Sequence, residues 1–459
     1  MNSGHRTSEV LADLTLSVCY DKLPQEVIAK AKELILDSIA CIIGGSRPEQ
    51  GVKTIRLFSA MGGVPDVHIF GTHEQVPLLN GIYVNSYLAT VLDFDDTYDG
   101  HPGSTVVPAA LNLGELNKVS GKAFLEAVVA GYETGIRVSN GIKPTAERTK
   151  QVRGINTWQI FCATAVASKL LGLNLQEATH ALSHAAIHAS VPSLRKWGFI
   201  DGRIQWLKNN FGWTSYGGVL SAILAKEGFV ADTTIFDGED GFWIMASSDR
   251  CDYDAMRRPL DNYNMLLVHS KPYPACRHIH PTLDAVRAII AETGVPPQSI
   301  QAIRVNTFYE VVENYEFLPT IPFDACFSAP YLIALLLHGI PPGLEWSNPE
   351  YIADERILNT ARKVELIEWK EASDAYPLVK RELMSRVEIV TADAGIHEKT
   401  IRIPRGDPRS PMSWEELETK FHHTVDPILE ADRAQKICAA LQTIENCTDL
   451  SEFTKLLVP

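Results

Sequence analysis

The sequence has little of what marks membrane-spanning, nucleic-acid-binding or disulfide-linked proteins. Its 56 Asp and Glu residues outnumber its 42 Lys and Arg residues, which gives a net charge of −14 at pH 7. No surplus of cations is therefore available to neutralise nucleic-acid phosphates or an anionic membrane. The longest apolar runs, such as residues 35–43, are interrupted by polar residues and fall short of the roughly 20 residues that cross a bilayer. We expect no nucleic-acid partner and no membrane partner.

The eight cysteines are scattered, and no two of them form a Cys-x-x-Cys pair. This spacing gives no zinc site and favours reduced thiols in a reducing compartment. Residues 1–6 lead straight into a helical pattern without the apolar core of a secretion signal. We therefore predict a cytoplasmic protein.

Helical hydrophobic periods dominate the chain up to about residue 265. A chain of 459 residues is too long for one ordinary core, so we predict a large all-helical domain over 1–265 and a second domain after it. The periodicity predicts one strand, at 66–70, and helices at 10–18, 23–43, 78–92, 106–116, 123–138, 161–171, 176–189 and 217–226.

Strand-like alternation then appears between further helical periods. It predicts helices at 282–292 and 330–337, and strands at 299–309, 385–391 and 399–403, the last two paired. The chain is thus expected to be mainly α, with a smaller α+β domain over 266–404 that ends at the turn-rich stretch 405–411. Ser413 and Glu416 form a capping box for a helix, and another helix is expected at 426–444.

The densest group of charged residues is the run Asp-Phe-Asp-Asp-Thr-Tyr-Asp-Gly-His-Pro-Gly at 93–103. It places four carboxylates and a histidine within nine residues, and like charges at this density repel, so folding alone gives little reason to gather them. At the end of a helix over 78–92, i, i+3 and i+4 spacing would place Asp93, Asp96 and Thr97 on one face. The run predicts an active-site corner.

Acid–base chemistry is the function we prefer for this run. Asp93 and His101 would move protons, while Thr97 would donate a hydrogen bond to a substrate. Ser104 or Thr105 fits the N-cap of the next helix, whose positive end favours an anionic ligand. The structural alternative is a solvated helix end that is simply rich in acids.

Magnesium binding is a further alternative, because Asp-Asp-x-x-Asp at 95–99 has the form of the aspartate-rich motif of isoprenoid synthases. Such enzymes also need a second metal-binding motif on a facing helix. No convincing one is found in this sequence.

A second cluster, Lys-Pro-Tyr-Pro-Ala-Cys-Arg-His-Ile-His-Pro at 271–281, brings together cationic side chains on a proline-rigidified turn. Lys271 and Arg277 are suited to binding carboxylates. His280 is either a ligand-binding group or a cap before the helix that follows. Cys276 is a packed residue rather than a nucleophile, since no Cys-His-Asn logic supports it.

Two single residues complete the candidates. Lys208 lies among Trp206, Leu207 and Phe211, so its ammonium either reaches solvent or meets an anion. Tyr331 would by default be a core aromatic residue.

At these motifs the sequence resembles the MmgE/PrpD family, which includes 2-methylcitrate dehydratases, cis-aconitate decarboxylases and iminodisuccinate epimerases. Several ordered motifs over most of the chain carry the resemblance, at 23–39, 93–110, 208–229, 271–281, 327–331 and 405–411. The acidic run with the Val-Val-Pro-Ala-Ala that follows it is the most specific match.

The resemblance implies a large helical domain built from both chain ends, 1–265 and 405–459, with 266–404 as an α+β lid, and a homodimer. It also implies an active site between domain and lid that needs no metal or cofactor and acts on small di- or tricarboxylic acids. Catalytic roles are expected at Asp93, Thr97, His101, Lys208, Lys271 and Tyr331; contacts to substrate are expected at Arg277, His280 and Cys276.

Two departures bear on the reaction. Cis-aconitate decarboxylases of this family carry a histidine near the start of the helix that here begins around Trp158 and Gln159, and another where Cys276 stands. Both are absent here, which favours the dehydratase and epimerase branches over decarboxylation. We expect dehydration of a 2-methylcitrate-like acid; epimerisation of an imino- or amino-dicarboxylate is the nearest rival, and carboxylate binding without catalysis is a remote one.

Overall fold

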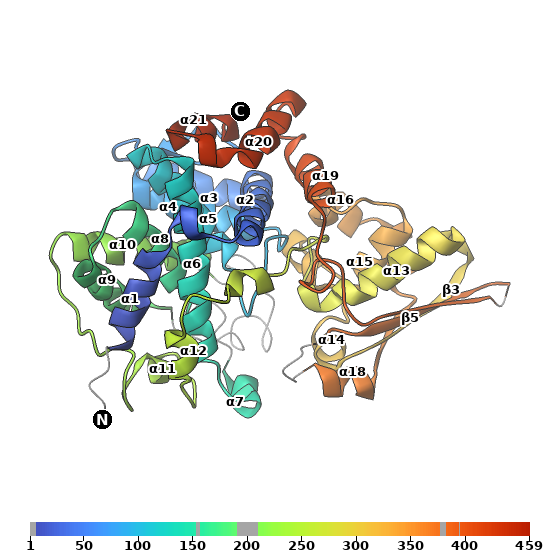
Figure 1. Cartoon of the computed structure of the whole chain (residues 1–459). Helices are drawn as coiled ribbons and strands as arrows, with labels where there is room; N and C mark the ends of the chain where they lie inside the picture. Colours follow the sequence, from blue (N-terminus) through green and yellow to red (C-terminus); the bar gives the residue numbers. More distant parts are fainter. Residues whose placement is uncertain (1–5, 153–156, 191–209, 377–381, 394) are drawn as a thin grey trace.

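A computed structural model describes residues 6–152, 157–190, 210–376, 382–393 and 395–459. Helices predominate, and the described strands form one two-stranded and one four-stranded sheet (Figure 1). The prediction of a mainly α chain is confirmed.

The larger hydrophobic core joins both ends of the chain. Its buried side chains run from Leu11 to Val268 and again from Met412 to Leu457, and we call these stretches the helical part. Its helices are α1 Thr7–Ser17, α2 Gln25–Gly45, α3 Glu49–Ala60, α4 Leu78–Thr90, α5 Gly103–Asn117, α6 Gly121–Gly141, α7 Ala146–Gln151, α8 Ile160–Leu170, α9 Leu175–His188, α10 Phe211–Lys226, α11 Phe242–Met245, α12 Tyr253–Arg257, α19 Trp414–Val425, α20 Ala431–Gln442 and α21 Leu450–Thr454.

Small residues let these helices pack closely. A Cβ at Gly135 of α6 would lie 2.1 Å from Cys162 Sγ of α8, so only glycine permits this crossing. In α2 the predicted apolar face is completely buried at Val27, Ala31 and Leu34, as its period requires. The strands β1 Val67–His68 and β2 Gln75–Val76 form a small antiparallel pair beside this core.

The second core lies in the α+β part, from Tyr273 to Ile389. Its four-stranded sheet has the order β4-β3-β5-β6, with β3 parallel to β4 and antiparallel to β5. Helix α13 packs against β5 and β6 (Figure 1). The elements are α13 His280–Thr293, β3 Ile300–Thr307, α14 Tyr309–Asn314, α15 Ala329–Leu337, α16 Pro349–Ile352, α17 Glu355–Ala361, β4 Val364–Glu368, α18 Lys370–Ala375, β5 Ser385–Thr391 and β6 Ile396–Ile401.

Short 3-10 helices connect several of these elements: η1 Tyr20–Lys22, η3 Asn264–Leu267, η4 Arg277–Ile279, η5 Pro297–Ser299, η6 Pro322–Phe327, η7 Leu344–Ser347, η8 Ile444–Asn446 and η9 Lys455–Leu457. A small third cluster, Cys41, Tyr87, Val91, Leu92 and Phe94, packs against Leu344 of η7 and so joins the two parts. The boundaries 1–265, 266–404 and 405–459 stay a prediction.

Most predicted elements are confirmed within a few residues, including the capping box of Ser413 and Glu416. Two expectations were wrong, and some elements, such as α3 and β4, were not predicted. Strand β4 was missed, because five residues with a parallel partner give little signal. Helix α5 begins at Gly103 with Pro102 as its N-cap, not with Ser104 or Thr105. The helix expected over 426–444 starts later, and a further short helix follows it.

None of the helices among the described residues is both long and apolar enough to traverse a bilayer.

Candidate active site

The carboxylates of the acidic run lie in a loop, not on a helix. Helix α4 ends at Thr90, and residues 91–102, the acidic loop, run as turns and bends to the start of α5. Asp93 and Asp99 have φ of +50° and +39°, a left-handed conformation that interrupts any helix. The expectation that Asp93, Asp96 and Thr97 share a helix face is therefore wrong.

A second segment of the chain is hydrogen-bonded to the acidic loop. Thr97 N donates to His269 O at 3.0 Å, and His269 N donates to Thr97 O at the same distance. This bridge brings residues 269–281, the cationic segment, beside the acidic loop. Two runs that are about 170 residues apart in sequence thus lie side by side in the fold.

The closest charged contact between them is the pair of Lys271 and Asp93. Lys271 Nζ donates to Asp93 Oδ1 at 2.6 Å and to Asp93 O at 2.8 Å. Both residues are about 1% exposed. A buried ion pair with additional hydrogen bonds fixes the two side chains relative to each other.

His101 is held by a second carboxylate. Its Nδ1 lies 3.1 Å from Asp95 Oδ2, and because a carboxylate accepts hydrogen bonds, we assign the ring proton to Nδ1. Nε2 is then the nitrogen that can accept a proton. Gln159 fixes the backbone of His101, since its Oε1 accepts from His101 N at 2.9 Å and its Nε2 donates to His101 O at 2.5 Å.

Asp96 has a structural role in the same loop. Its Oδ1 accepts from Gly103 N at 2.9 Å and its Oδ2 accepts from Tyr132 Oη at 2.6 Å, so it caps α5 from outside the helix. Burial raises the pKa of Asp96 to about 7, against the lowering effect of these hydrogen bonds. Asp96 therefore exchanges its proton near neutral pH.

In the cationic segment, Arg277 differs from its neighbours. Its guanidinium makes no hydrogen bond or ion pair to another described residue. Burial lowers the pKa of Arg277 from its usual value, yet an arginine stays charged. A partly buried cation of this kind is suited to an anionic ligand.

The other two predicted contact residues are engaged within the protein. His280 Nε2 lies 3.0 Å from Ala275 O, and burial lowers the pKa of His280 to about 3, so the ring is neutral and packed at the start of α13. Cys276 Sγ donates to Tyr315 Oη at 3.5 Å, and burial raises the pKa of its thiol. A neutral thiol is a poor nucleophile.

The described contacts do not bring Tyr331 into the cluster. Tyr331 is fully buried in α15, and its Oη donates to Trp346 O at 3.3 Å, as expected of a core aromatic residue. Lys208 lies outside the described residues. A catalytic role for either one stays a prediction.

Three ligand atoms could hold a metal ion, one each from Asp93, Asp95 and His101, within 4.8 Å of one another. The ammonium of Lys271 already lies against Asp93, and a second cation there would be repelled. The contacts of the Asp-Asp-x-x-Asp motif also disfavour magnesium binding. Asp96 accepts a hydrogen bond from Tyr132, and Asp99 lies 3.4 Å from Lys143 Nζ.

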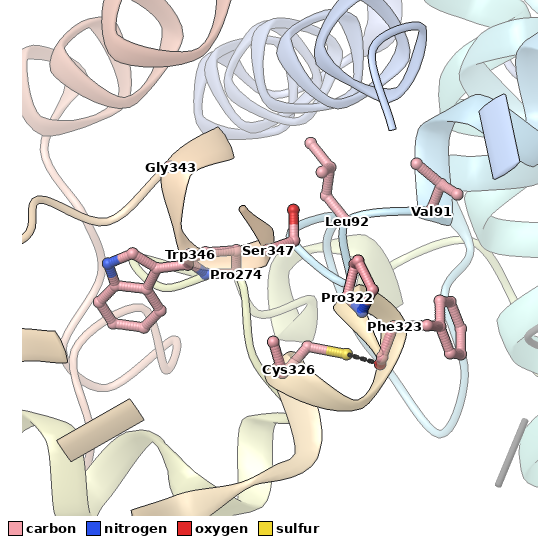
Figure 2. Close-up of a pocket in the computed structure, with 10 residues that line it drawn as sticks. Val91, Leu92, Pro274, Pro322, Phe323, Cys326, Gly343, Trp346 and Ser347 are labelled. Atoms are coloured by element: carbon pink, nitrogen blue, oxygen red, sulfur yellow. Dashed lines mark hydrogen bonds between the residues drawn. The ribbon is translucent and has the colours of Figure 1, made fainter. Parts of the chain in front are cut away.

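A small pocket borders the site where the two parts meet. Figure 2 shows Val91 and Leu92 of the acidic loop beside Phe323 and Cys326 of η6. The lining is mostly apolar and includes none of the described carboxylates of the loop. Hydrocarbon groups suit this pocket better than charged ones.

Sequence reasoning missed the roles of Asp95 and Gln159. Asp95 was recognised as part of the acidic run but not as the partner of His101, because i, i+6 contacts follow from no helical period. Gln159 is the N-cap residue of α8, and only the folded chain brings it to His101.

A buried carboxylate–cation pair and a buried carboxylate–histidine pair thus have their carboxylates in the same loop, and such clusters of titratable groups are candidates for acid–base chemistry. The MmgE/PrpD N-terminal domain model matches residues 9–253, and the MmgE/PrpD C-terminal domain model matches residues 273–446. The chain therefore belongs to the MmgE/PrpD family, as predicted.

Several relatives are named for one reaction. The human cis-aconitate decarboxylase is 25% identical over 95% of this chain and 91% of the relative. The mouse cis-aconitate decarboxylase is 23% identical over 98% of this chain and 93% of the relative. The cis-aconitate decarboxylase-like protein oryM of Aspergillus oryzae is 22% identical over 95% of this chain and 94% of the relative. These matches support the prediction of an enzyme of the lyase class.

Proposed function

We propose that the chain is a cofactor-free lyase that acts on a small tricarboxylic acid and dehydrates a 2-methylcitrate-like hydroxy acid. The observation that carries the proposal is the adjacency of two buried pairs, Lys271–Asp93 and His101–Asp95. One supplies a fixed cation and the other an oriented base. Proton removal next to a carboxylate requires both.

His101 is the base in this proposal. Asp95 holds its Nδ1 proton, so Nε2 can take the proton from the carbon next to a carboxylate. Asp93 is the weaker candidate, because the Lys271 ammonium occupies its Oδ1. The imidazolium, or an acid on the other face, then protonates the hydroxyl on the neighbouring carbon. The C–O bond breaks, an alkene forms and water leaves.

The cationic segment binds the substrate carboxylates. Lys271 stabilises the charge that develops on the carboxylate beside the reacting carbon, and Arg277 binds a second carboxylate through its planar donors. Thr97 donates a hydrogen bond to substrate. Lys208 and Tyr331 are retained as catalytic residues on the resemblance alone.

Decarboxylation of cis-aconitate is the second candidate, and the named relatives favour it. The bond to one carboxylate would break, carbon dioxide would leave and protonated His101 would protonate the carbon. Gln159 and Cys276 argue against this reaction, because the two positions without the decarboxylase histidines lie at the site itself. Epimerisation of iminodisuccinate uses the same base, with return of the proton to the opposite face.

We further propose that the α+β part acts as a lid over the site, that the chain forms a homodimer and that it works in the cytoplasm. The position of the acidic loop and the cationic segment between the two cores supports the first of these (Figure 1). Size-exclusion chromatography with light scattering tests the second.

Proton NMR in deuterated water with EDTA present tests the function. Wild type and His101→Gln are each incubated with 2-methylcitrate, citrate, cis-aconitate and iminodisuccinate. With wild type only, we expect the methyl doublet of 2-methylcitrate to be replaced by the methyl singlet of a tetrasubstituted alkene, or a vinyl proton to appear if the proton leaves from the methylene carbon. Release of carbon dioxide from cis-aconitate would show that the chain is a decarboxylase and not a dehydratase. Entry of deuterium next to a carboxylate without formation of an alkene would indicate epimerisation. Turnover that EDTA abolishes and magnesium restores would contradict the cofactor-free mechanism.

A further inference from the structure

A buried lysine that is far from both motifs in the sequence contacts both of them in the fold. Lys420, on α19, is 6% exposed. Its Nζ donates to Asp37 Oδ1 at 2.5 Å, to Phe94 O at 2.5 Å and to Lys271 O at 3.0 Å. An ammonium has three donors, so all of them are used.

The three acceptors belong to three separate segments: α2, the acidic loop and the cationic segment. Phe94 directly follows Asp93, and Lys271 is the residue whose side chain pairs with Asp93. Lys420 therefore holds the backbone at both members of this pair. Its Nζ also lies 3.8 Å from the centre of the Phe94 ring, which adds a cation–π contact.

We propose that Lys420 is a positioning residue, which fixes the acidic loop and the cationic segment so that Asp93 and Lys271 face the substrate in one geometry. Neither motif contains it, and the proposed chemistry does not use it directly. Its activity readout rests on the proposed function; its structural readout does not.

The charge of Lys420 is matched locally rather than by the site. Asp37 is fully buried, and burial raises the pKa of Asp37 while Lys420 counteracts the rise. The ammonium and this carboxylate form an ion pair, so the cation that binds the two backbone carbonyls has a carboxylate partner outside both motifs.

The chain offers a matched control in Lys169 of α8. Its Nζ also donates to two backbone carbonyls, Leu16 O at 3.3 Å and Val18 O at 2.7 Å, and lies 3.3 Å from Glu126. None of these partners belongs to the acidic loop or the cationic segment. Lys169→Met thus removes the same kind of contact without touching the site.

The experiment compares wild type with Lys420→Met, Lys420→Arg, Asp37→Asn and Lys169→Met. Melting temperature, kcat and KM are measured with an acid that wild type converts. Hydrogen–deuterium exchange followed by mass spectrometry reports on peptides covering 91–99 and 269–276. The exchange measurement needs no substrate.

For Lys420→Met we expect kcat to fall by about 10²-fold with little change in KM, since displaced groups lose about that factor. Exchange should accelerate in both peptides. Lys169→Met should lower the melting temperature and leave kcat and both peptides unchanged. Asp37→Asn should lose less kcat than Lys420→Met, because the ammonium still binds both carbonyls.

Equal kcat in Lys420→Met and Lys169→Met would overturn the proposal and leave Lys420 a purely structural residue. If Lys420→Met does not fold, the test uses Lys420→Arg, because a planar guanidinium cannot aim its donors at the same three acceptors. A wild-type kcat in Lys420→Arg would overturn the proposal.

If wild type converts none of the acids, the proposed function fails. Unchanged exchange in both peptides would then overturn the positioning role by itself.

Discussion

The acidic loop and the cationic segment meet at one site but are organised in opposite ways. Every carboxylate of the loop has a partner of its own: Asp93 has Lys271, Asp95 has His101, Asp96 has Tyr132 and Asp99 has Lys143. In the cationic segment only Lys271 is paired with a carboxylate of the loop, His280 is neutral, and Arg277 has no partner among the described residues.

The difference shows how one run of acids can serve several purposes. The partner of each carboxylate, rather than its place in the run, decides whether it orients a base, balances a cation or caps a helix. In the proposed function, the cationic segment keeps the charge of Arg277 for a ligand. The comparison predicts that removing a loop partner disturbs catalysis or stability, whereas removing Arg277 disturbs substrate binding.

The largest effect is expected from the base. His101→Gln should lower kcat by about 10² to 10⁴-fold, the range for removal of a general base, and Asp95→Asn should lower it less, because the imidazole remains but its orientation is lost. Steady-state kinetics on the substrate identified by NMR measure both. His188→Gln, a histidine of α9 bonded to Ser221, is the control, and an equal loss there would contradict a specific role for His101.

Breaking the ion pair should come next. Lys271→Met leaves the Asp93 carboxylate buried without its cation, so the free energy of unfolding should fall by about 3–5 kcal/mol along with activity. The double variant Lys271→Met with Asp93→Asn should recover part of this stability. Urea unfolding measures the three proteins, and strictly additive losses would show that the two side chains do not couple.

A smaller effect is expected at Arg277. Arg277→Met should raise KM by about 10- to 100-fold, since a charged hydrogen bond contributes about 1.5–3 kcal/mol, and should change kcat less. Arg304→Met on β3, whose guanidinium lies 3.6 Å from Glu388 and outside the cationic segment, is the control. A fall in kcat at constant KM would place Arg277 in the chemical step instead.

The last prediction concerns the pH dependence of stability. The pKa of Asp96 is about 7 in the folded chain, against 3.8 for an unperturbed aspartate, so between roughly pH 4 and pH 7 the folded chain binds a proton that the unfolded chain has lost. This group therefore lowers stability as pH rises through that window, by about 1.4 kcal/mol per pH unit, and adds no slope above it. The slope should vanish in Asp96→Asn, and equal slopes in both proteins by denaturant unfolding would refute this assignment.

Local patterns predicted most of the fold. The apolar periods of α2, α6 and α13 and the alternation of β5 lie within single elements, so the sequence alone locates them. The pairing of β3 with β4 involves residues about 60 positions apart, and no local pattern encodes it.

The candidate site shows the same limit. Both motifs were found because charged and special residues cluster in sequence, yet their partners were not. Periodicity predicts Asp93 on a helix because it contains no information about the bridge between Thr97 and His269, two residues from distant segments. The sequence around Gln159 and Lys420 carries no signal for their roles, since each residue is identified only by hydrogen-bond partners that other segments supply.

The discontinuous helical core has a consequence for biosynthesis. Its last buried residues, from Met412 to Leu457, leave the ribosome only after the whole α+β part has been made. Until then Asp37 lacks the ammonium of Lys420, and the apolar face of α2 that α19 covers is exposed. We expect the nascent chain to depend on chaperones through this interval, and any chain that terminates before residue 412 to be removed by proteolysis rather than to persist as an inactive enzyme.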